Sequence, residues 1–138
     1  GRGSAMLEVL DGRYTYRPRS GDPLGIGEPP EMDREEAYDA TIDSDYPDAL
    51  VQIAAMCTAE RSGDVILSAT RDWDFRARYE PIPHVSSHGA LHRDHMLVPL
   101  ILNRLPRTVP RRTADIFPSA LAALGVSPPR LLDGRSFL

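Results

Sequence analysis

The sequence contains no lysine, only one cysteine and no long apolar stretch, and each absence excludes a class of protein. All 16 basic residues are arginines, and 20 acidic residues bring the net charge to −4. This charge argues against a nucleic-acid polymer as partner, because phosphate binding needs a basic surface. No apolar run approaches the roughly 20 residues of a membrane span, and no signal peptide is recognisable. We expect a cytoplasmic protein without a membrane partner.

The single cysteine, Cys57, cannot form an internal disulfide. It lies in an apolar pattern, so we expect a buried and inert thiol. The chain of 138 residues is long enough for one domain with its own core. Residues 1–5 resemble a tag remnant and we exclude them from the fold, which leaves residues 6–138 as a single domain. Thirteen prolines divide that domain into short elements joined by long loops, which is unusual for a self-sufficient domain.

Near the N-terminus the pattern predicts a hairpin. Residues 7–10 and 13–17 read as strands on either side of Asp11-Gly12, a strong turn signal. The glycine-rich residues 21–27 superficially resemble a phosphate-binding loop. They lack the Gly-Lys-Ser/Thr ending, and Pro23 removes one amide, so we interpret them as a turn-rich loop.

Helical and apolar patterns then alternate along the chain. We predict a short acidic helix at residues 33–41 and a helix capped by Asp45 or Tyr46 that ends at residues 61–63. Residues 64–69 and 96–102 read as buried strands. Thr113 and Gly125 bound a further helix, with Ile116, Leu121 and Leu124 on its apolar side. This order of elements predicts an α/β fold.

All four histidines of the chain lie within twelve residues. They are His84, His88, His92 and His95. Imidazole is the commonest metal ligand and the usual acid or base at neutral pH. A helix through the cluster would align three of the rings, but Pro83 and Gly89 oppose one. In a strand, His88 and His92 would lie about 13 Å apart, too far for one ion. We therefore predict a loop with one or two functional histidines; exposed or hydrogen-bonded histidines without a ligand are the alternative.

Other polar residues near the cluster are weaker candidates. Asp72, Asp74 and Glu80 could join imidazole in a zinc or manganese shell, although surface carboxylates are equally ordinary. The serine pair 86–87 and Ser119 offer hydroxyls. No Gly-x-Ser-x-Gly turn surrounds them, so they do not predict a nucleophile.

Two segments carry a resemblance to a known family. Residues 86–99, Ser-Ser-His-Gly-Ala-Leu-His-Arg-Asp-His-Met-Leu-Val-Pro, resemble the "HG…VP" segment of the alkaline phosphatase superfamily. Residues 112–125, with Asp133-Gly-Arg-Ser-Phe137, resemble the closing "T-x-D-x-x-P-T…L-G…P…x-G-x-S" segment of the same enzymes. The nearest branch is the type I phosphodiesterase/nucleotide pyrophosphatase-like hydrolases, and the resemblance covers residues 64–138.

This resemblance implies a partial alkaline-phosphatase-like sheet flanked by helices. In such enzymes two metal ions, usually zinc and sometimes manganese, clamp the oxygens of a phosphoryl displacement. By that match His88 would bind one metal, and Gly89 would let the backbone turn close to it. His92 and His95 match no ligand of the family and could line the pocket.

The departures from the family pattern limit what the chain could do alone. Ser87 precedes His88, so there is no Asp-His-Gly motif, and no nucleophile segment is recognisable. One histidine cannot hold a catalytic zinc, which needs about three protein ligands. We therefore expect the C-terminal part of a longer hydrolase, inactive alone, whose partners are the rest of its own enzyme chain and a small-molecule phosphoester.

Two other interpretations stay open at this stage. The chain could be a free-standing binding or structural domain without catalysis, or a small metal-binding protein that uses several of the histidines. A fragment taken from a larger sheet would expose apolar edges and could form a homodimer to cover them.

Overall fold

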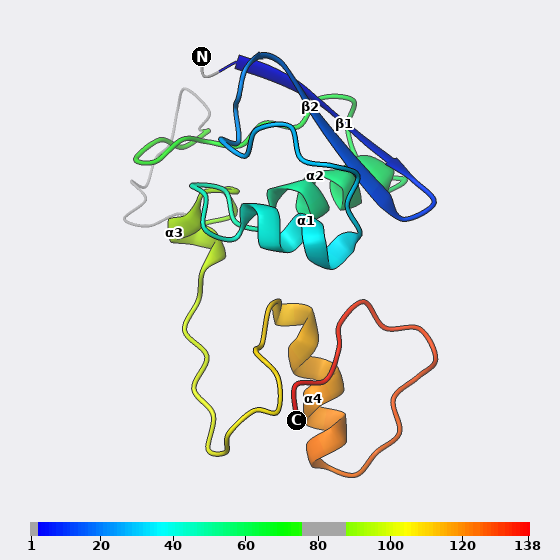
Figure 1. The fold of residues 1–138 in the computed structure, drawn as a ribbon. Helices are drawn as coiled ribbons and strands as arrows, with labels where there is room; N and C mark the ends of the chain where they lie inside the picture. The colour runs from blue at the N-terminus through cyan, green and yellow to red at the C-terminus, as the bar shows by residue number, and fades with distance from the viewer. Residues whose placement is uncertain (1–2, 76–87) are drawn as a thin grey trace. The chain divides into compact units, whose positions relative to one another are not determined.

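A computed structural model describes residues 3–75 and 88–138 of the chain. Within these residues the fold is mixed α/β, with one two-stranded antiparallel sheet and four α-helices. The chain divides into two compact units, Gly1–Val98 and Pro99–Leu138. Figure 1 shows the elements in chain order. The prediction of α and β elements in one chain is confirmed at this level, and the larger alkaline-phosphatase-like sheet stays a prediction.

The first unit begins with the predicted hairpin. β1 (Gly3–Leu10) pairs antiparallel with β2 (Arg13–Gly21). Asp11 and Gly12 form the two-residue turn, with φ angles of 50° and 76°. Positive φ at both turn positions matches the natural twist of paired strands, which explains why Asp-Gly favours this connection.

The hairpin is longer than predicted, and this corrects the expectation for the first residues of the chain. We expected residues 1–5 to lie outside the fold, but Gly3 pairs with Gly21 and Ala5 pairs with Pro18. Strand pairing uses main-chain groups, so residues without distinctive side chains can extend an established ladder. Gly3 has a φ of 125°, and a side chain there would overlap the carbonyl of Ser20.

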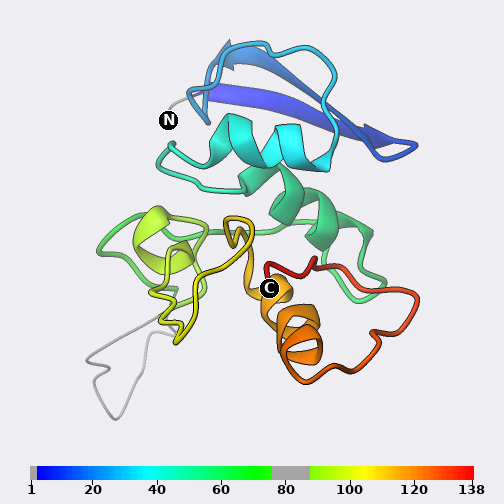
Figure 2. The ribbon, with the colours of Figure 1, turned by 60° about the horizontal axis from the view of Figure 1, so that its bottom comes forward.

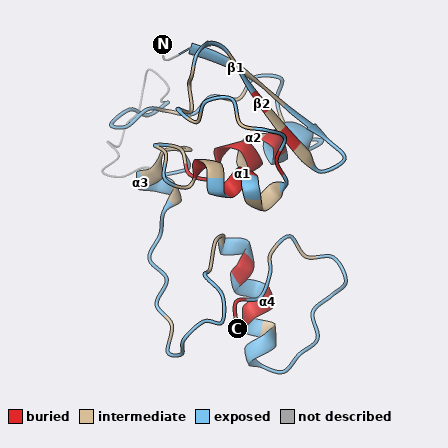
Figure 3. Ribbon diagram, in the orientation of Figure 1, coloured by how far each residue is buried: buried red, intermediate tan, exposed pale blue. Residues whose placement is uncertain are grey.

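One face of the hairpin carries the core of the first unit. Tyr14 and Tyr16 lie two residues apart on β2 and therefore point to the same side of the sheet. Both are buried, and Tyr16 is only 2% exposed. α1 (Arg34–Thr41) and α2 (Ala49–Thr58) pack below this face, as Figures 2 and 3 show. The core cluster comprises Tyr14, Tyr16, Met32, Ala37, Leu50, Val51 and Ala54.

α1 confirms the helix predicted at residues 33–41. Its N-cap is Asp33, whose carboxylate accepts hydrogen bonds from the amides of Glu35 and Glu36, both at 2.8 Å. The Glu36 carboxylate in turn accepts from the amide of Asp33 at 2.6 Å. This reciprocal arrangement is a capping box, and it satisfies amides that the first helical turn leaves without partners.

α2 begins later than the sequence predicts. We expected Asp45 or Tyr46 to cap it and Pro47 to lie in its first turn, but the helix begins at Ala49. Asp48 has a φ of 58°, in the left-handed region, so a right-handed helix cannot run through it. Instead, the amide of Ala49 donates to the carbonyl of Tyr46 at 3.2 Å and closes a turn that contains Asp48.

The apolar stripe predicted for α2 is correct for its first two turns only. Leu50 and Ala54 are buried, whereas Cys57 is exposed. The prediction of a buried thiol is therefore wrong. The core cluster ends at Ala54, and Met56 beyond it is 42% exposed as well.

The two predicted buried strands are absent. Residues 64–69 form no strand, and residues 96–102 begin at the end of a short helix, α3 (Arg93–Met96), and continue without regular structure. Apolar residues of these segments are exposed, namely Val65 (76%), Leu67 (69%), Val98 (62%) and Ile101 (93%). An apolar run becomes a stable strand only by pairing with neighbours. Among the described residues, β1 and β2 are the only strands that pair; apart from them there is one isolated bridge, between Tyr14 and Met32.

The second unit contains the helix predicted at residues 113–125. Its first turn is a 3₁₀ turn, η1 (Thr113–Asp115), so Thr113 lies inside the helical segment rather than at its cap. α4 (Ile116–Ala123) follows directly. Gly125 ends it as predicted, with a φ of 68°, and the amide of Val126 donates to the carbonyl of Leu121 at 2.9 Å. This is a Schellman arrangement, in which glycine tolerates the left-handed backbone.

The buried side of α4 differs from the predicted one. Ile116 and Leu124 are 45% and 76% exposed. The residues that are buried instead are Pro118 and Ser119. Helical spacing alone could not reveal this, because a polar group rather than an apolar stripe organises the contacts of this helix.

The capping box of α1 gives a direct test of the first unit. We expect Asp33→Ala to lower the free energy of unfolding by about 1 kcal/mol, because two amides lose their acceptor. Urea denaturation followed by far-ultraviolet circular dichroism measures this change. Asp33→Ser keeps an acceptor at the cap and should lose much less; equal losses in the two variants would show that the side-chain acceptor is not what stabilises the start of the helix.

Candidate functional site

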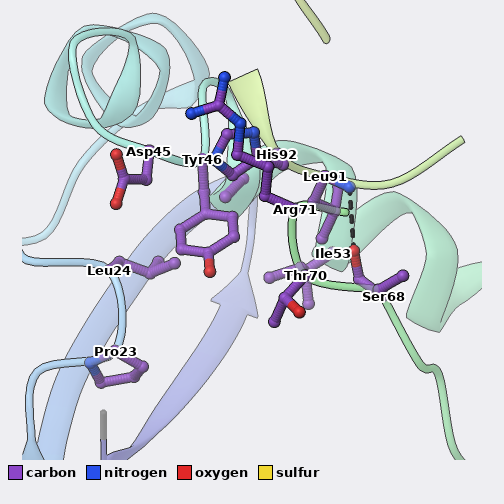
Figure 4. Close-up of a pocket in the computed structure, with 12 residues that line it drawn as sticks. Pro23, Leu24, Asp45, Tyr46, Ile53, Ser68, Thr70, Arg71, Leu91 and His92 are labelled. Atoms are coloured by element: carbon purple, nitrogen blue, oxygen red, sulfur yellow. Dashed lines mark hydrogen bonds between the residues drawn. The ribbon is translucent and has the colours of Figure 1, made fainter. Parts of the chain in front are cut away.

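A cavity of about 510 Å³ lies within the first unit, beside the start of α2. Figure 4 shows that its walls come from four stretches of chain that are distant in sequence. Its lining residues are Pro23, Leu24, Asp45, Tyr46, Ala49, Ile53, Ser68, Ala69, Thr70, Arg71, Leu91 and His92. The walls are mainly apolar, with a few polar groups, which is the usual composition of a small-molecule site.

Backbone contacts hold these stretches together. The amide of Leu91 donates to the hydroxyl of Ser68 at 3.0 Å, across 23 residues. The amide of Arg93 donates to the carbonyl of Asp45 at 2.9 Å. The cavity therefore brings part of the histidine segment beside residues 68–71 and the turn before α2, an arrangement that no local sequence pattern predicts.

His92 is the histidine that lies in this cavity. Its side chain is 16% exposed, and its ring meets the ring of Tyr46 edge-on, with centroids 6.1 Å apart and planes at 88°. Its Nδ1 accepts a hydrogen bond from the amide of Asp94 at 3.3 Å and so caps α3. A neutral imidazole that accepts at Nδ1 carries its proton on Nε2. His92 thus fixes the local backbone and orients Tyr46.

An ion pair joins Arg71, which lines the cavity, to Asp94, which does not. The guanidinium Nε of Arg71 lies 3.0 Å from Oδ2 of Asp94, which is also 3.7 Å from Nδ1 of His92. The side chains of Arg71 and Asp94 are 69% and 44% exposed. Because exposed pairs contribute little stability, this pair mainly neutralises charge at the rim.

The other histidines do not gather around this cavity. His88 is exposed, is followed by Gly89 with a φ of 95°, and does not line the cavity. His95 is exposed, and its Nδ1 accepts from the amide of Ala90 at 3.3 Å. His84, Glu80 and residues 86–87 lie outside the described residues. We expected His88 beside the end of a buried strand, and this is wrong because residues 96–102 form no strand.

No group of three or more histidine, cysteine, aspartate or glutamate residues suited to a metal occurs in residues 3–75 and 88–138. Asp72 and Asp74 lie in an exposed stretch and complete no such group with a histidine. His88 is accessible to an ion, but a zinc ion there would need its remaining ligands from outside the described part of the chain. The metal role of His88 stays a prediction.

In the glycine-rich loop at residues 21–27, the carboxylate of Asp22 binds the backbone amides of the loop itself. Asp22 accepts hydrogen bonds from the amides of Gly25 at 3.0 Å and Gly27 at 2.6 Å, and from the hydroxyl of Tyr16 at 2.7 Å. These are the amides that a bound phosphate would need. The interpretation as a turn-rich loop is therefore confirmed.

This contact couples the loop to the core electrostatically. Burial, together with donation to Asp22, raises the pKa of Tyr16 to about 12. The hydrogen bond from Tyr16 and the amide of Gly27 lower the pKa of Asp22. The hydrogen bond thus favours a protonated Tyr16, which donates, and an ionised Asp22, which accepts.

In the second unit, Asp115 and Ser119 connect residues 112–125 to residues 133–137. The carboxylate of Asp115 accepts from the amides of Arg135 at 2.9 Å, Arg112 at 3.0 Å and Arg111 at 3.1 Å. The hydroxyl of Ser119, 1% exposed, donates to the carbonyl of Asp115 at 2.6 Å. These bonds tie the C-terminal tail to the start of α4.

Two further contacts complete this junction. The amide of Phe137 donates to the hydroxyl of Ser119 at 2.9 Å, and the ring of Phe137 is buried. A side chain at Gly134 would overlap the carbonyl of Ala114, so only glycine allows the tail to approach so closely. Ser119 is fully engaged and buried, which agrees with the expectation that it is not a nucleophile.

Comparisons with known proteins add no relative. No family model matches the chain, and neither a curated protein nor a solved structure matches it. Among the described residues, no helix has the length and apolar composition needed to cross a membrane.

The Asp115 carboxylate predicts how the second unit responds to pH. Burial would raise its pKa, but the three backbone amides outweigh burial and the pKa is lowered. A carboxylate whose pKa is lowered by folding contributes its full stabilisation of the folded state at pH values above its unfolded-state pKa, which is about 3.9. This stabilisation is lost as the pH falls through the lower folded-state value. We expect the amides of Arg135 and Phe137 to lose hydrogen-exchange protection on acidification below about pH 4.

Asp115→Asn tests the same contact at neutral pH. The side-chain amide cannot accept at both of its ends, so we expect a loss of about 1–3 kcal/mol in the second unit. NMR hydrogen exchange at Arg135 and Phe137 measures this loss. Asp64→Asn makes the same chemical change at an exposed position in the first unit and should leave the exchange of these two amides unchanged; an equal loss in both variants would refute the role of Asp115.

Proposed function

We propose that this chain is the C-terminal part of a metal-dependent phosphodiesterase/nucleotide pyrophosphatase-like hydrolase of the alkaline phosphatase superfamily. Its partner is the rest of its own enzyme chain, its substrate is a small-molecule phosphoester, and the enzyme is cytoplasmic. His88 is its contribution to a two-metal site that binds zinc, or manganese in its place. The chain alone lacks hydrolase activity, because a zinc ion needs about three protein ligands.

The observation that carries this proposal is the junction around Asp115. The resemblance rests partly on two short segments, one at residues 112–125 and one at residues 133–137. The motif positions Asp115 and Ser119 in the first segment bond to Arg135 and Phe137 of the second. Both segments lie in the compact unit Pro99–Leu138, and these bonds join them. Their contact supports treating the motif as one structural element that closes the C-terminal end of such an enzyme.

Exposed apolar side chains provide a second, independent support. Leu97, Val98, Leu100 and Ile101 are 48%, 62%, 43% and 93% exposed, in the segment that directly follows α3. Runs of exposed apolar residues commonly mark surfaces that another protein segment covers. In this proposal, the remainder of the enzyme chain covers them and supplies the strands with which residues 96–102 pair. A second copy of the isolated chain could cover them in its place.

The test compares two exposed histidines in the protein produced from the complete gene. We expect His88→Ala to lower the metal content and to reduce hydrolysis of bis(p-nitrophenyl) phosphate more than about 100-fold. This exceeds the loss caused by removing an outer hydrogen-bond partner of a ligand. His95→Ala is the matched control, since the resemblance gives His95 no ligand role, and it should retain both metal and activity.

The measurements are metal content by mass spectrometry and hydrolysis rate at saturating substrate. The 138-residue chain alone should show no hydrolysis. The proposal fails if the two variants lose activity equally, if His88→Ala keeps its metal, or if the complete gene encodes no upstream catalytic segment.

A free-standing binding domain is the second candidate function. The cavity beside Tyr46 favours it, because this cavity is formed within the first unit and involves neither His88 nor a metal.

A further inference from the structure

The cavity of the first unit has the dimensions of a ligand site. Its volume of about 510 Å³ falls within the range of roughly 300–1,000 Å³ that small-molecule pockets occupy. Aliphatic side chains of Leu24, Ile53 and Leu91 contribute to its lining. These side chains come from the loop after β2, from α2 and from the segment before α3, so the cavity belongs to the tertiary structure and not to one local turn.

Tyr46 gives this cavity an aromatic wall. The Tyr46 and His92 rings meet at 88°, so at most one face of the tyrosine ring contacts the histidine. The perpendicular contact also restricts rotation of the phenol. Offset stacking on a preoriented ring is favourable for another planar ring. In Figure 4 the phenol extends into the space between Leu24 and Thr70.

Two hydroxyl groups give the cavity a polar edge. The hydroxyls of Tyr46 and Thr70 have no hydrogen-bond partner among the described residues, whereas the neighbouring Ser68 hydroxyl accepts from Leu91. A hydroxyl donates one hydrogen bond and accepts others. The Thr70 hydroxyl can therefore recognise the edge of a ligand stacked on Tyr46, whether that edge carries a donor or an acceptor.

The charges around the cavity disfavour an anion. Arg71 is paired with Asp94, and the carboxylate of Asp45 also lines the cavity. An anionic ligand would have to compete with Asp94 for the guanidinium, whereas a neutral ligand meets no such cost.

We propose that this cavity binds a neutral, planar aromatic or heteroaromatic molecule, stacked on Tyr46 and hydrogen-bonded through its edge to the hydroxyl of Thr70. This site is separate from the proposed metal role of His88, which does not line the cavity. The inference therefore goes beyond the phosphodiesterase proposal and stands or fails without it.

An NMR titration of the 138-residue chain tests this site with defined probes. Indole is neutral and planar and carries an edge donor; benzoate is planar but anionic, and cyclohexanol is neutral but not planar. We expect indole to cause saturable amide shifts at Ala49, Ile53, Ala69 and Leu91, with a dissociation constant on the order of 1 mM. Benzoate and cyclohexanol should bind at least about 5-fold more weakly.

Single variants then separate the proposed contacts. Thr70→Val removes the edge hydroxyl with little change in shape and should weaken indole binding about 3- to 5-fold. Tyr46→Phe keeps the stacking face and should bind indole within about 2-fold of the unaltered chain, whereas Tyr46→Ala removes that face and should weaken binding about 10-fold. Ile53→Trp should fill the cavity and abolish binding. Val65→Ala is the control, since Val65 is 76% exposed and does not line the cavity, and it should bind indole normally.

Resonances of the β1–β2 hairpin show whether each variant is folded. If Ile53→Trp does not fold, Thr70→Val and Tyr46→Ala still decide the question. The proposal is overturned if indole shifts do not saturate, if benzoate or cyclohexanol binds as tightly as indole, or if Thr70→Val and Tyr46→Ala both bind indole as the unaltered chain does. No metal is present in this experiment, so its failure leaves the role of His88 untouched.

Discussion

The carboxylate of Asp115 is the group on which the order of the C-terminal unit depends. That unit contains one short helix and little apolar burial, so a hydrophobic core does not hold it together. Instead, one buried side chain accepts from three backbone amides, and Ser119 extends the network to the tail. Burying a carboxylate is costly unless its acceptors are satisfied. Satisfied in this way, Asp115 fixes the chain reversal that brings Gly134 against Ala114.

The first unit is built on a different principle, since apolar burial dominates it. Tyr14 and Tyr16 present one face of the hairpin to α1 and α2, and Leu50 lies at the centre of the contact. The phenol of Tyr16 is also polar, and Asp22 satisfies it. The same carboxylate fills the glycine-rich loop, so one contact anchors the loop and removes its phosphate-binding capacity.

How much of this structure the sequence could predict depended on the range of the interactions involved. The Asp11-Gly12 turn, the helix after Asp33 and the stop at Gly125 are local signals, and all three were confirmed. Residues 64–69 and 96–102 were misjudged as strands, because apolar composition does not reveal whether a pairing partner exists. The cavity was missed for a related reason: its residues lie on four separated stretches, and only the ring pair of Tyr46 and His92 marks the point where they meet.

The histidine cluster shows the same limit for function. The spacing of the histidines does not distinguish His92 from the others, yet His92 lies in the cavity. The resemblance points to His88 instead, and His88 is exposed. Under the proposed function, His88 is one ligand of a site that other segments of a longer enzyme would complete, because an isolated imidazole cannot bind zinc tightly. The same proposal explains two observations: apolar residues after α3 are exposed, and the described part of the chain contains no complete group of metal ligands.

A crystal structure of the full-length protein with anomalous data at the zinc edge tests this account most directly. The account predicts an anomalous peak about 2.0–2.1 Å from a ring nitrogen of His88, with the remaining ligands supplied by upstream residues. A His88 ring that faces solvent, with the metal bound elsewhere or not at all, would contradict it.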